Sequence, residues 1–321
     1  RRSFVCSHQT SLTKSMTFTQ MLTFAEATAP IVIDGGLGSA AEDRGIDLDH
    51  ALWSAELIRR GPDTLLAIHA AFADSGARIL TTASYQATPL GFAEAGIGTA
   101  EGSRIIAESV RVARSAAERR DVPVAGSVGP FGAALGDGAE YTGSYHRSPE
   151  EYTAFHRPRI DTLAEAGADL LAIETQPRLD EIAAIIDLAD ETGLPSWVTV
   201  TLQTGTDTSS PTLPDGSTLA EFAEAAAASA RVQAIGVNCV RPSLVTPALK
   251  ELSRHTDLPL IAYPNSGEIY DAATLTWRDG AEAGVGSWPV AEWGRLGARI
   301  IGGCCRVRPE DIAALTERTR A

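Results

Sequence analysis

The sequence lacks a hydrophobic run long enough to cross a membrane: about 20 consecutive apolar residues are needed, and the 321 residues contain no such run. Residues 1–15 are polar and lack the apolar stretch of a secretory signal. Basic residues are also scarce, since 27 Lys and Arg stand against 41 Asp and Glu, a formal net charge of -14. An acidic surface disfavours nucleic acid and anionic membranes as partners. We therefore expect a cytoplasmic protein that acts on small molecules, as a monomer or a small homo-oligomer.

The chain alternates short apolar runs with amphipathic segments from about Pro30 to its end. Most of the apolar runs lack polar alternation, which is typical of parallel strands covered on both faces. The predicted strands are Ile31–Asp34, Arg78–Thr82, Pro123–Ser127, Leu170–Glu174, Ser196–Leu202, Ala234–Asn238, Leu260–Tyr263 and Arg299–Gly302. The predicted helices are Asp63–Ser75, Ala100–Arg119, Pro149–Glu165, Leu179–Glu191, Leu219–Ala230, Leu244–His255 and Pro309–Arg318.

Eight strands in alternation with helices favour a closed (β/α)8 TIM barrel, with an open doubly wound sheet as the alternative. No linker divides the chain, so we predict one domain over residues 29–321, preceded by a tail over residues 1–28 that is flexible in its first part. Two polar stretches, Gln203–Ser217 and Asn265–Trp288, are predicted loops that follow strands. A barrel places its active site in such loops.

Cysteine is rare, and three of the four cysteines follow two predicted strands. Cys239 ends the sixth strand, and Cys304 and Cys305 follow the eighth after two glycines that would permit a sharp turn. All three would lie at one barrel mouth, where three thiolates suit a zinc ion with an open fourth position. The alternatives are buried thiols without a function and a vicinal disulfide, which would close a strained ring. We favour the metal.

Two acidic residues also follow predicted strands. Asp34 lies in an Asp-Gly-Gly sequence after the first strand, and Glu174 ends the fourth. Two carboxylates at one mouth could bind a substrate ammonium group or exchange protons. The simpler interpretation of each is a turn or cap residue, since Asp before Gly is a common turn signal.

These motifs together resemble the homocysteine S-methyltransferases, over nearly the whole chain from Ala29 to Ala321. Within that family, Ser84–Ala87 and Tyr263–Glu268 resemble the S-methylmethionine-dependent branch. The resemblance is carried by Asp34–Gly36, Thr82–Ala87, Ser127–Pro130, Glu174-Thr175, Gly236–Cys239, Tyr263–Glu268 and Gly302–Cys305.

The resemblance implies zinc bound by Cys239, Cys304 and Cys305, and homocysteine held through Asp34 and Glu174. It further implies methyl transfer from a sulfonium donor, S-methylmethionine or S-adenosylmethionine, to the homocysteine thiolate, which gives methionine. Aromatic faces attract soft cations, so we list Tyr85 and Trp288 as weaker candidates for substrate contact. Asn238 is a further weak candidate because it belongs to the Asn-Cys motif.

Three alternatives stay open at this point. The donor could be betaine or a methylfolate, because the Asn-Cys and Gly-Gly-Cys-Cys elements belong to the whole superfamily. A zinc hydrolase or lyase would need histidine or carboxylate ligands, and none of the six histidines ends a predicted strand. A purely structural zinc clamp would need a fourth ligand, for which Cys6 is the remaining cysteine.

Overall fold

The computed structural model describes residues 16–27, 29–46, 54–203, 211–271, 276–278, 280 and 284–320. Across these parts of the chain, we find no helix with the length and apolar character that a membrane crossing requires. Cys6, His8 and His50, and residues 204–210 of the Gln203–Ser217 loop, lie outside the described residues.

Eight parallel strands form one sheet, in the order β1-β10-β7-β6-β5-β4-β3-β2. This order follows the chain once around, so the predicted (β/α)8 barrel is confirmed and the doubly wound alternative, whose strand order would reverse, is wrong. Each strand lies within two residues of its predicted bounds. The strands are β1 (Ile31–Val32), β2 (Leu80–Thr81), β3 (Val124–Val128), β4 (Leu170–Gln176), β5 (Ser196–Val200), β6 (Val232–Asn238), β7 (Leu260–Tyr263) and β10 (Ala298–Ile301).

The first and second strands meet through two contacts rather than a regular ladder. The backbone N–H of Arg78 donates to the carbonyl of Val32 at 2.7 Å. Beyond it, the Asp34 carboxylate accepts the backbone N–H of Thr81 at 2.7 Å. A side chain therefore takes the place of a backbone acceptor where β1 meets β2, and the same side chain faces the barrel mouth.

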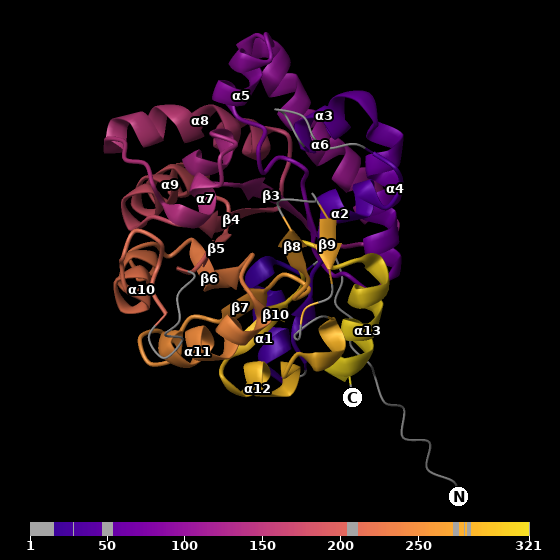
Figure 1. Cartoon of the computed structure of the whole chain (residues 1–321), viewed down its shortest axis with the longest axis vertical. Helices are drawn as coiled ribbons and strands as arrows, with labels where there is room; N and C mark the ends of the chain where they lie inside the picture. Colours follow the sequence, from indigo (N-terminus) through magenta and orange to yellow (C-terminus); the bar gives the residue numbers. More distant parts are fainter. Residues whose placement is uncertain are drawn as a thin grey trace, which may run out of the picture.

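The outer helices surround the strands in chain order (Figure 1). All seven predicted helices are present, with ends that differ from the prediction by at most three residues. They are α4 (Pro62–Asp74), α6 (Thr99–Ala117), α8 (Pro149–Glu165), α9 (Leu179–Thr192), α10 (Leu219–Ala227), α11 (Pro242–Leu252) and α13 (Pro309–Arg320). Capping boxes at Ser148 and Thr218 begin α8 and α10, and Gly193 with a φ of 74° ends α9.

Shorter elements lie in the connections. The helices are α2 (Leu37–Glu42), α3 (Ser54–Arg60), α5 (Pro89–Glu94), α7 (Ala139–Thr142) and α12 (Val290–Arg295), with 3-10 turns η1 (Phe131–Ala134) and η2 (Val285–Ser287). The predicted loop Asn265–Trp288 also contains two antiparallel strands, β8 (Ile269–Asp271) and β9 (Thr276–Arg278).

Helix α1 (Phe18–Ala27) lies within the segment that the sequence assigned to the tail. Phe18, Met21 and Leu22 are buried against inward-facing strand residues, including Trp197, whose ring centroid is 6.0 Å from that of Phe18. In Figure 1 this helix lies inside the ring of outer helices, and it packs beside β1 and β10. It covers the end of the barrel opposite the strand carboxyl ends, and so it belongs to the packed domain.

Candidate active site

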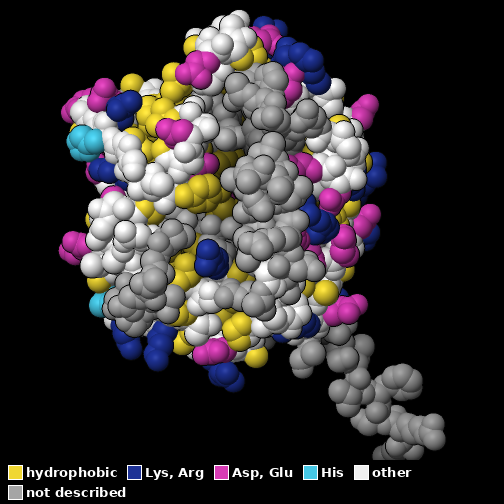
Figure 2. All heavy atoms as spheres, viewed as in Figure 1, with side chains coloured by type: hydrophobic (Ala, Val, Ile, Leu, Met, Phe, Trp, Pro, Cys, Tyr) yellow, Lys and Arg dark blue, Asp and Glu magenta, His cyan; other side chains and the backbone are white. Residues whose placement is uncertain are grey.

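A cavity of about 300 Å³ opens where the strands reach their carboxyl ends. In Figure 2, hydrophobic side chains are visible toward the middle of this face, and acidic side chains lie mainly around its edge. The residues that line the cavity and bear on its chemistry are Asp34, Thr81, Thr82, Tyr85, Gln86, Ser127, Glu140, Tyr141, Glu174, Thr175, Cys239, Tyr263, Cys304 and Cys305.

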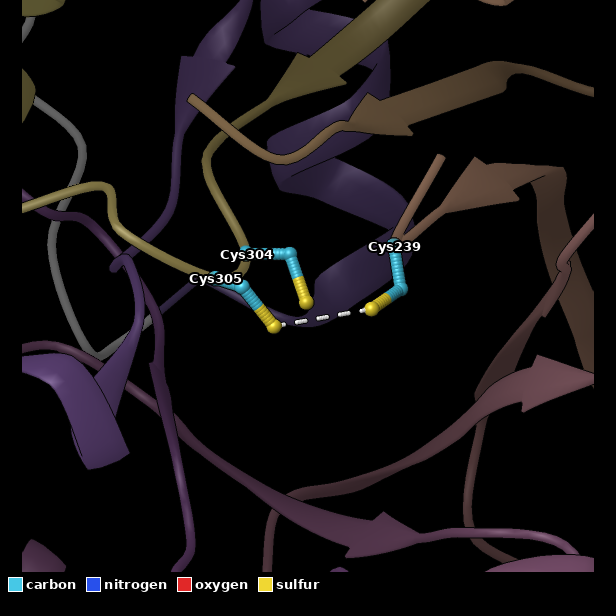
Figure 3. Close-up of side chains that lie close together, drawn as sticks. All are labelled: Cys239, Cys304 and Cys305. Atoms are coloured by element: carbon cyan, nitrogen blue, oxygen red, sulfur yellow. Dashed lines mark hydrogen bonds between the residues drawn. The ribbon is translucent and has the colours of Figure 1, made fainter. Parts of the chain in front are cut away.

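The three predicted metal ligands lie together on one wall of this cavity. Their sulfur atoms all lie within 4.8 Å of one another, and those of Cys239 and Cys305 are 3.7 Å apart. Figure 3 shows the three side chains pointing toward one another, Cys239 from the end of β6 and the pair from the segment after β10. Metal–thiolate bonds of about 2.3 Å in a tetrahedral centre place sulfur atoms about 3.8 Å apart. The three residues therefore fit a thiolate metal centre.

The end of β7 brings the two cysteine segments together. The Cys239 N–H donates to the Tyr263 carbonyl at 3.2 Å, and the Cys304 N–H donates to the Pro264 carbonyl at 2.8 Å. The Cys305 N–H donates to the Asn265 side-chain oxygen at 3.1 Å. Because β7 lies between β6 and β10, its last residues fix both flanking segments. This gives the Tyr-Pro-Asn motif a structural role.

The two glycines before the cysteine pair allow close packing of the backbone. Neither Gly302 nor Gly303 has a positive φ; the left-handed residue of this segment is Arg306, with a φ of 65°. A Cβ on Gly302 would lie 2.3 Å from Ile33, and one on Gly303 would lie 2.1 Å from Val307. Gly302 is therefore required for close approach to the segment after the first strand, and Gly303 allows the chain to fold back so that Val307 packs against it.

Two left-handed residues, Thr175 and Cys239, stand at the ends of β4 and β6 with φ of 60° and 53°. Such a φ is strained for a β-branched residue. Asn238 holds Thr175 in place: its side-chain oxygen accepts the Thr175 N–H at 2.7 Å and its amide nitrogen donates to the Thr175 hydroxyl at 2.7 Å. The same oxygen accepts the Thr199 hydroxyl. Asn238, a predicted substrate contact, is buried and does not line the cavity, and its observed role is to support Thr175.

The three thiols do not titrate alike. Hydrogen bonds with Cys239 and Cys304 hold the pKa of the Cys305 thiol well below its ordinary value. Hydrogen bonds with Cys239 and Cys305, together with burial, raise the pKa of Cys304 well above it. One thiolate thus forms readily, whereas three adjacent thiolates require a cation to balance their charge.

The two predicted carboxylates both line the cavity. Asp34 is 3% exposed and also accepts the Thr81 hydroxyl; burial raises its pKa to about 8, against the hydrogen bonds from Thr81. Glu174 is half-buried and accepts the Ser127 hydroxyl; burial raises its pKa to about 7, against hydrogen bonds from Ser127 and Tyr263. An ammonium group beside them would restore the charged form of each.

Tyr85 lines the cavity as predicted, and a buried polar network holds it there. Fully buried Arg159 donates to the carbonyls of Tyr85 at 2.7 Å and Gly129 at 2.5 Å, and to Nδ1 of His156 at 2.9 Å. Arginine only donates, so Nδ1 accepts and Nε2 of neutral His156 donates to Glu181 at 2.7 Å. The network links the loops after β2 and β3.

Trp288, a predicted substrate contact, lies away from the cavity. It is 1% exposed, its ring lies 5.7 Å from that of Trp293, and it does not line the cavity. Arg318 of α13 donates to its carbonyl at 2.7 Å. Although its loop follows a strand carboxyl end, the indole packs among the outer helices instead of facing the mouth.

Two lining residues of α7 escaped the sequence analysis. The Tyr141 hydroxyl lies 3.3 Å from the Cys239 sulfur, and its side chain is 42% exposed. Glu140 is half-buried, and burial raises its pKa to about 7, as does the nearby Cys239. A four-residue helix between glycines has no periodic signal, so the sequence offered little that could have found either residue.

Among the residues that the structure describes, the ionisable side chains that line this cavity are all acidic or thiol groups, apart from its tyrosines. Its described lining holds three carboxylates, those of Asp34, Glu140 and Glu174, together with the three thiols, and it includes no Lys, Arg or His. The cavity therefore favours positively charged groups on its ligands. It offers no basic residue to a polyanionic ligand, and no histidine joins the described metal ligands.

The sequence model of the family described as homocysteine S-methyltransferase matches residues 31–319. The chain belongs to this family. A homocysteine S-methyltransferase of Escherichia coli (strain K12) is 42% identical over 302 residues, covering 90% of this chain and 95% of that protein. The homocysteine S-methyltransferase YbgG of Bacillus subtilis (strain 168) is 38% identical, covering 91% and 95%. A selenocysteine Se-methyltransferase of Brassica oleracea is 34% identical, covering 96% and 94%.

Solved structures of the family agree with the fold. The metallated form of the homocysteine methyltransferase MmuM from Escherichia coli matches with a TM-score of 0.80 and 39% identity, covering 92% of this chain and 98% of that one. Its oxidized form matches with a TM-score of 0.80 and 40% identity. The family resemblance drawn from the motifs is thus confirmed.

Proposed function

We propose that this protein transfers a methyl group from a sulfonium donor, S-methylmethionine in the first place and S-adenosylmethionine in the second, to the sulfur of homocysteine. The observation that carries the proposal is the group of three thiols within 4.8 Å of one another, on the wall of a cavity whose described lining is acidic and has no basic side chain. Family membership supports homocysteine as the methyl acceptor.

Cys239, Cys304 and Cys305 would hold a zinc ion, because their sulfur spacing and all-sulfur donor set suit it. Zinc, when bound, supplies the positive charge that keeps the homocysteine sulfur ionised at neutral pH, where a free thiol is mostly protonated. Three free thiols also support a reducing, cytoplasmic location.

Asp34 and Glu174 would bind the ammonium group of homocysteine. Thr81 orients the first carboxylate and Ser127 the second, so that both are placed before the substrate arrives. In this way the amino-acid end of the substrate is anchored, and its sulfur is directed to the cysteine wall.

In the transfer, a new bond forms between the homocysteine sulfur and the methyl carbon as the bond from that carbon to the sulfonium sulfur breaks. The bonding electrons remain on the departing sulfur, which leaves as a neutral thioether, and the proton of the homocysteine thiol is released. With S-methylmethionine as donor, both products are methionine. A methylfolate, by contrast, carries carboxylates that the acidic cavity does not favour.

A methyl-transfer assay with homocysteine and a panel of donors tests the proposal. The panel contains S-methylmethionine, S-adenosylmethionine, betaine and a methyltetrahydrofolate, each carrying a labelled methyl group. We expect labelled methionine from the two sulfonium donors, fastest from S-methylmethionine, with loss of activity on zinc chelation. Label arriving only from betaine or the folate, or undiminished transfer by metal-free protein, would contradict the proposal.

A further inference from the structure

Helix α7 (Ala139–Thr142) is a short, well-held element beside the cysteine wall. Left-handed glycines flank it, Gly138 with a φ of 81° and Gly143 with a φ of 62°. Gly132 lies so close that a Cβ there would be 2.7 Å from the backbone of Ala139 and Glu140. Arg178 donates to the Gly143 carbonyl at 3.1 Å. Helix α7 is thus fixed at both ends, and the direction of its side chains is set by the backbone.

Both middle residues of α7 face the cavity, and each has an unusual environment. The Tyr141 hydroxyl is 3.3 Å from the Cys239 sulfur, which places α7 at the edge of the thiol group. One oxygen of Glu140, Oε2, is buried and has no hydrogen-bond partner among the described residues. Burying a carboxylate oxygen without a partner is costly. An oxygen in this state is suited to a ligand that brings positive charge.

The neighbours of Glu140 suit one kind of cation. Tyr85 lines the same cavity, where burial and, to a smaller extent, the charge of Glu140 raise its pKa. A carboxylate that lines a cavity together with two tyrosines complements a soft, weakly hydrated cation, which aromatic faces also attract. The sulfonium of the donor must lie near the thiol group, because its methyl is transferred to a sulfur there.

We propose that Glu140, assisted by Tyr141 and Tyr85, forms the subsite for the donor sulfonium. Asp34, which follows β1, and Glu174 of β4 would then bind homocysteine. Of the three lining carboxylates, two would serve the acceptor and one the donor. Glu140 acts on the donor through charge and leaves metal and acceptor binding to the other residues. This inference rests on the proposed function, since it assumes a sulfonium donor.

Glu140→Gln, which removes the charge and keeps the shape, tests the subsite. Loss of a charge-assisted contact is expected to raise the KM of S-methylmethionine about 10- to 100-fold, while the zinc content and the homocysteine dissociation constant stay unchanged. Glu118→Gln, the same change at an exposed residue beyond the end of α6, is the control and should alter none of these.

Glu140→Asp provides a second variant, because it keeps the charge but withdraws it from the cavity. It should fold even if the glutamine variant does not, and it should raise the donor KM to a smaller extent. An unchanged donor KM in either folded variant, or a loss of zinc or homocysteine binding in the glutamine variant, would overturn the inference while the proposed function stands. Absence of transfer from either sulfonium donor by the unaltered protein would instead overturn the proposed function.

Discussion

The two ends of the barrel differ in the chemical character of their residues. At the closed end, Phe18, Met21 and Leu22 of α1 pack on Trp197 in an apolar cluster. At the mouth lie strained backbone, carboxyls with raised pKa and a buried oxygen without a partner among the described residues. The closed end thus stabilises the fold, while the mouth keeps unfavourable features of the kind found at binding sites, and the proposed metal ion and substrates would balance its buried charges.

The first prediction concerns the cysteine wall and has the largest expected effect. Cys304→Ser should remove zinc and lower methyl transfer by at least about 100-fold, since even residues that only support metal ligands contribute 10- to 100-fold. Zinc content and initial rate would be measured on the same preparation. Cys6→Ser makes the same chemical change outside the described residues and is the control. Loss of zinc in that control would favour a structural four-cysteine clamp over an open site.

At the closed end, Phe18→Ala should lower the free energy of unfolding by about 3 kcal/mol, because it removes a buried ring. Turnover by the folded fraction should not change. Urea unfolding and steady-state kinetics measure the two effects separately. Thr23→Ala, at an exposed position of the same helix, should be nearly neutral. A fall in kcat for Phe18→Ala at full folding would show that the two ends are coupled.

At the mouth, Glu174→Gln should weaken substrate binding and leave stability nearly unchanged, which is the reverse of the result expected for Phe18→Ala. We expect the homocysteine KM to rise about tenfold or more through loss of a charge-assisted contact, with little change in zinc content or stability. Glu94→Gln, exposed on α5, serves as the control. Zinc loss in the Glu174 variant would instead make the carboxylate part of the metal centre.

A separate effect at the mouth is a pH dependence of stability caused by Asp34. Burial raises its pKa to about 8 in the folded protein, above the ordinary value of 3.8 that approximates the unfolded chain. Between these pH values the folded state binds the extra proton, so stability decreases as pH rises, by at most about 1.4 kcal/mol per pH unit. Asp34→Asn should flatten this slope in urea unfolding of chelated protein. An equal slope in both proteins would rule out Asp34 as its source.

The contrast between the two ends also explains what the sequence could predict. Apolar runs such as Leu260–Tyr263 indicate strands buried on both faces, so the predicted bounds of the barrel strands lie within two residues of the observed ones. Cys239, the cysteine pair, Asp34 and Glu174 were found because each follows or ends a strand, and strand ends converge in a barrel.

The failures have equally specific causes. The direction of the Trp288 indole depends on packing against Trp293, which no local pattern records. Glu140 and Tyr141 reach the mouth through a four-residue helix whose position is set by contacts with Gly132 and Arg178, both outside it. Helix α1 was not predicted because its apolar residues pack on strand residues that are distant in the sequence, at the closed end of the barrel.

The central claim is that three cysteines hold zinc and leave room for the sulfur of homocysteine. Zinc-edge X-ray absorption of the zinc-loaded protein, recorded before and after addition of homocysteine, tests it most directly. We expect three sulfur ligands at about 2.3 Å before addition and four afterwards, with no change when homoserine, which has a hydroxyl in place of the thiol, is added instead. A sulfur count that stays the same on addition of homocysteine would contradict the claim.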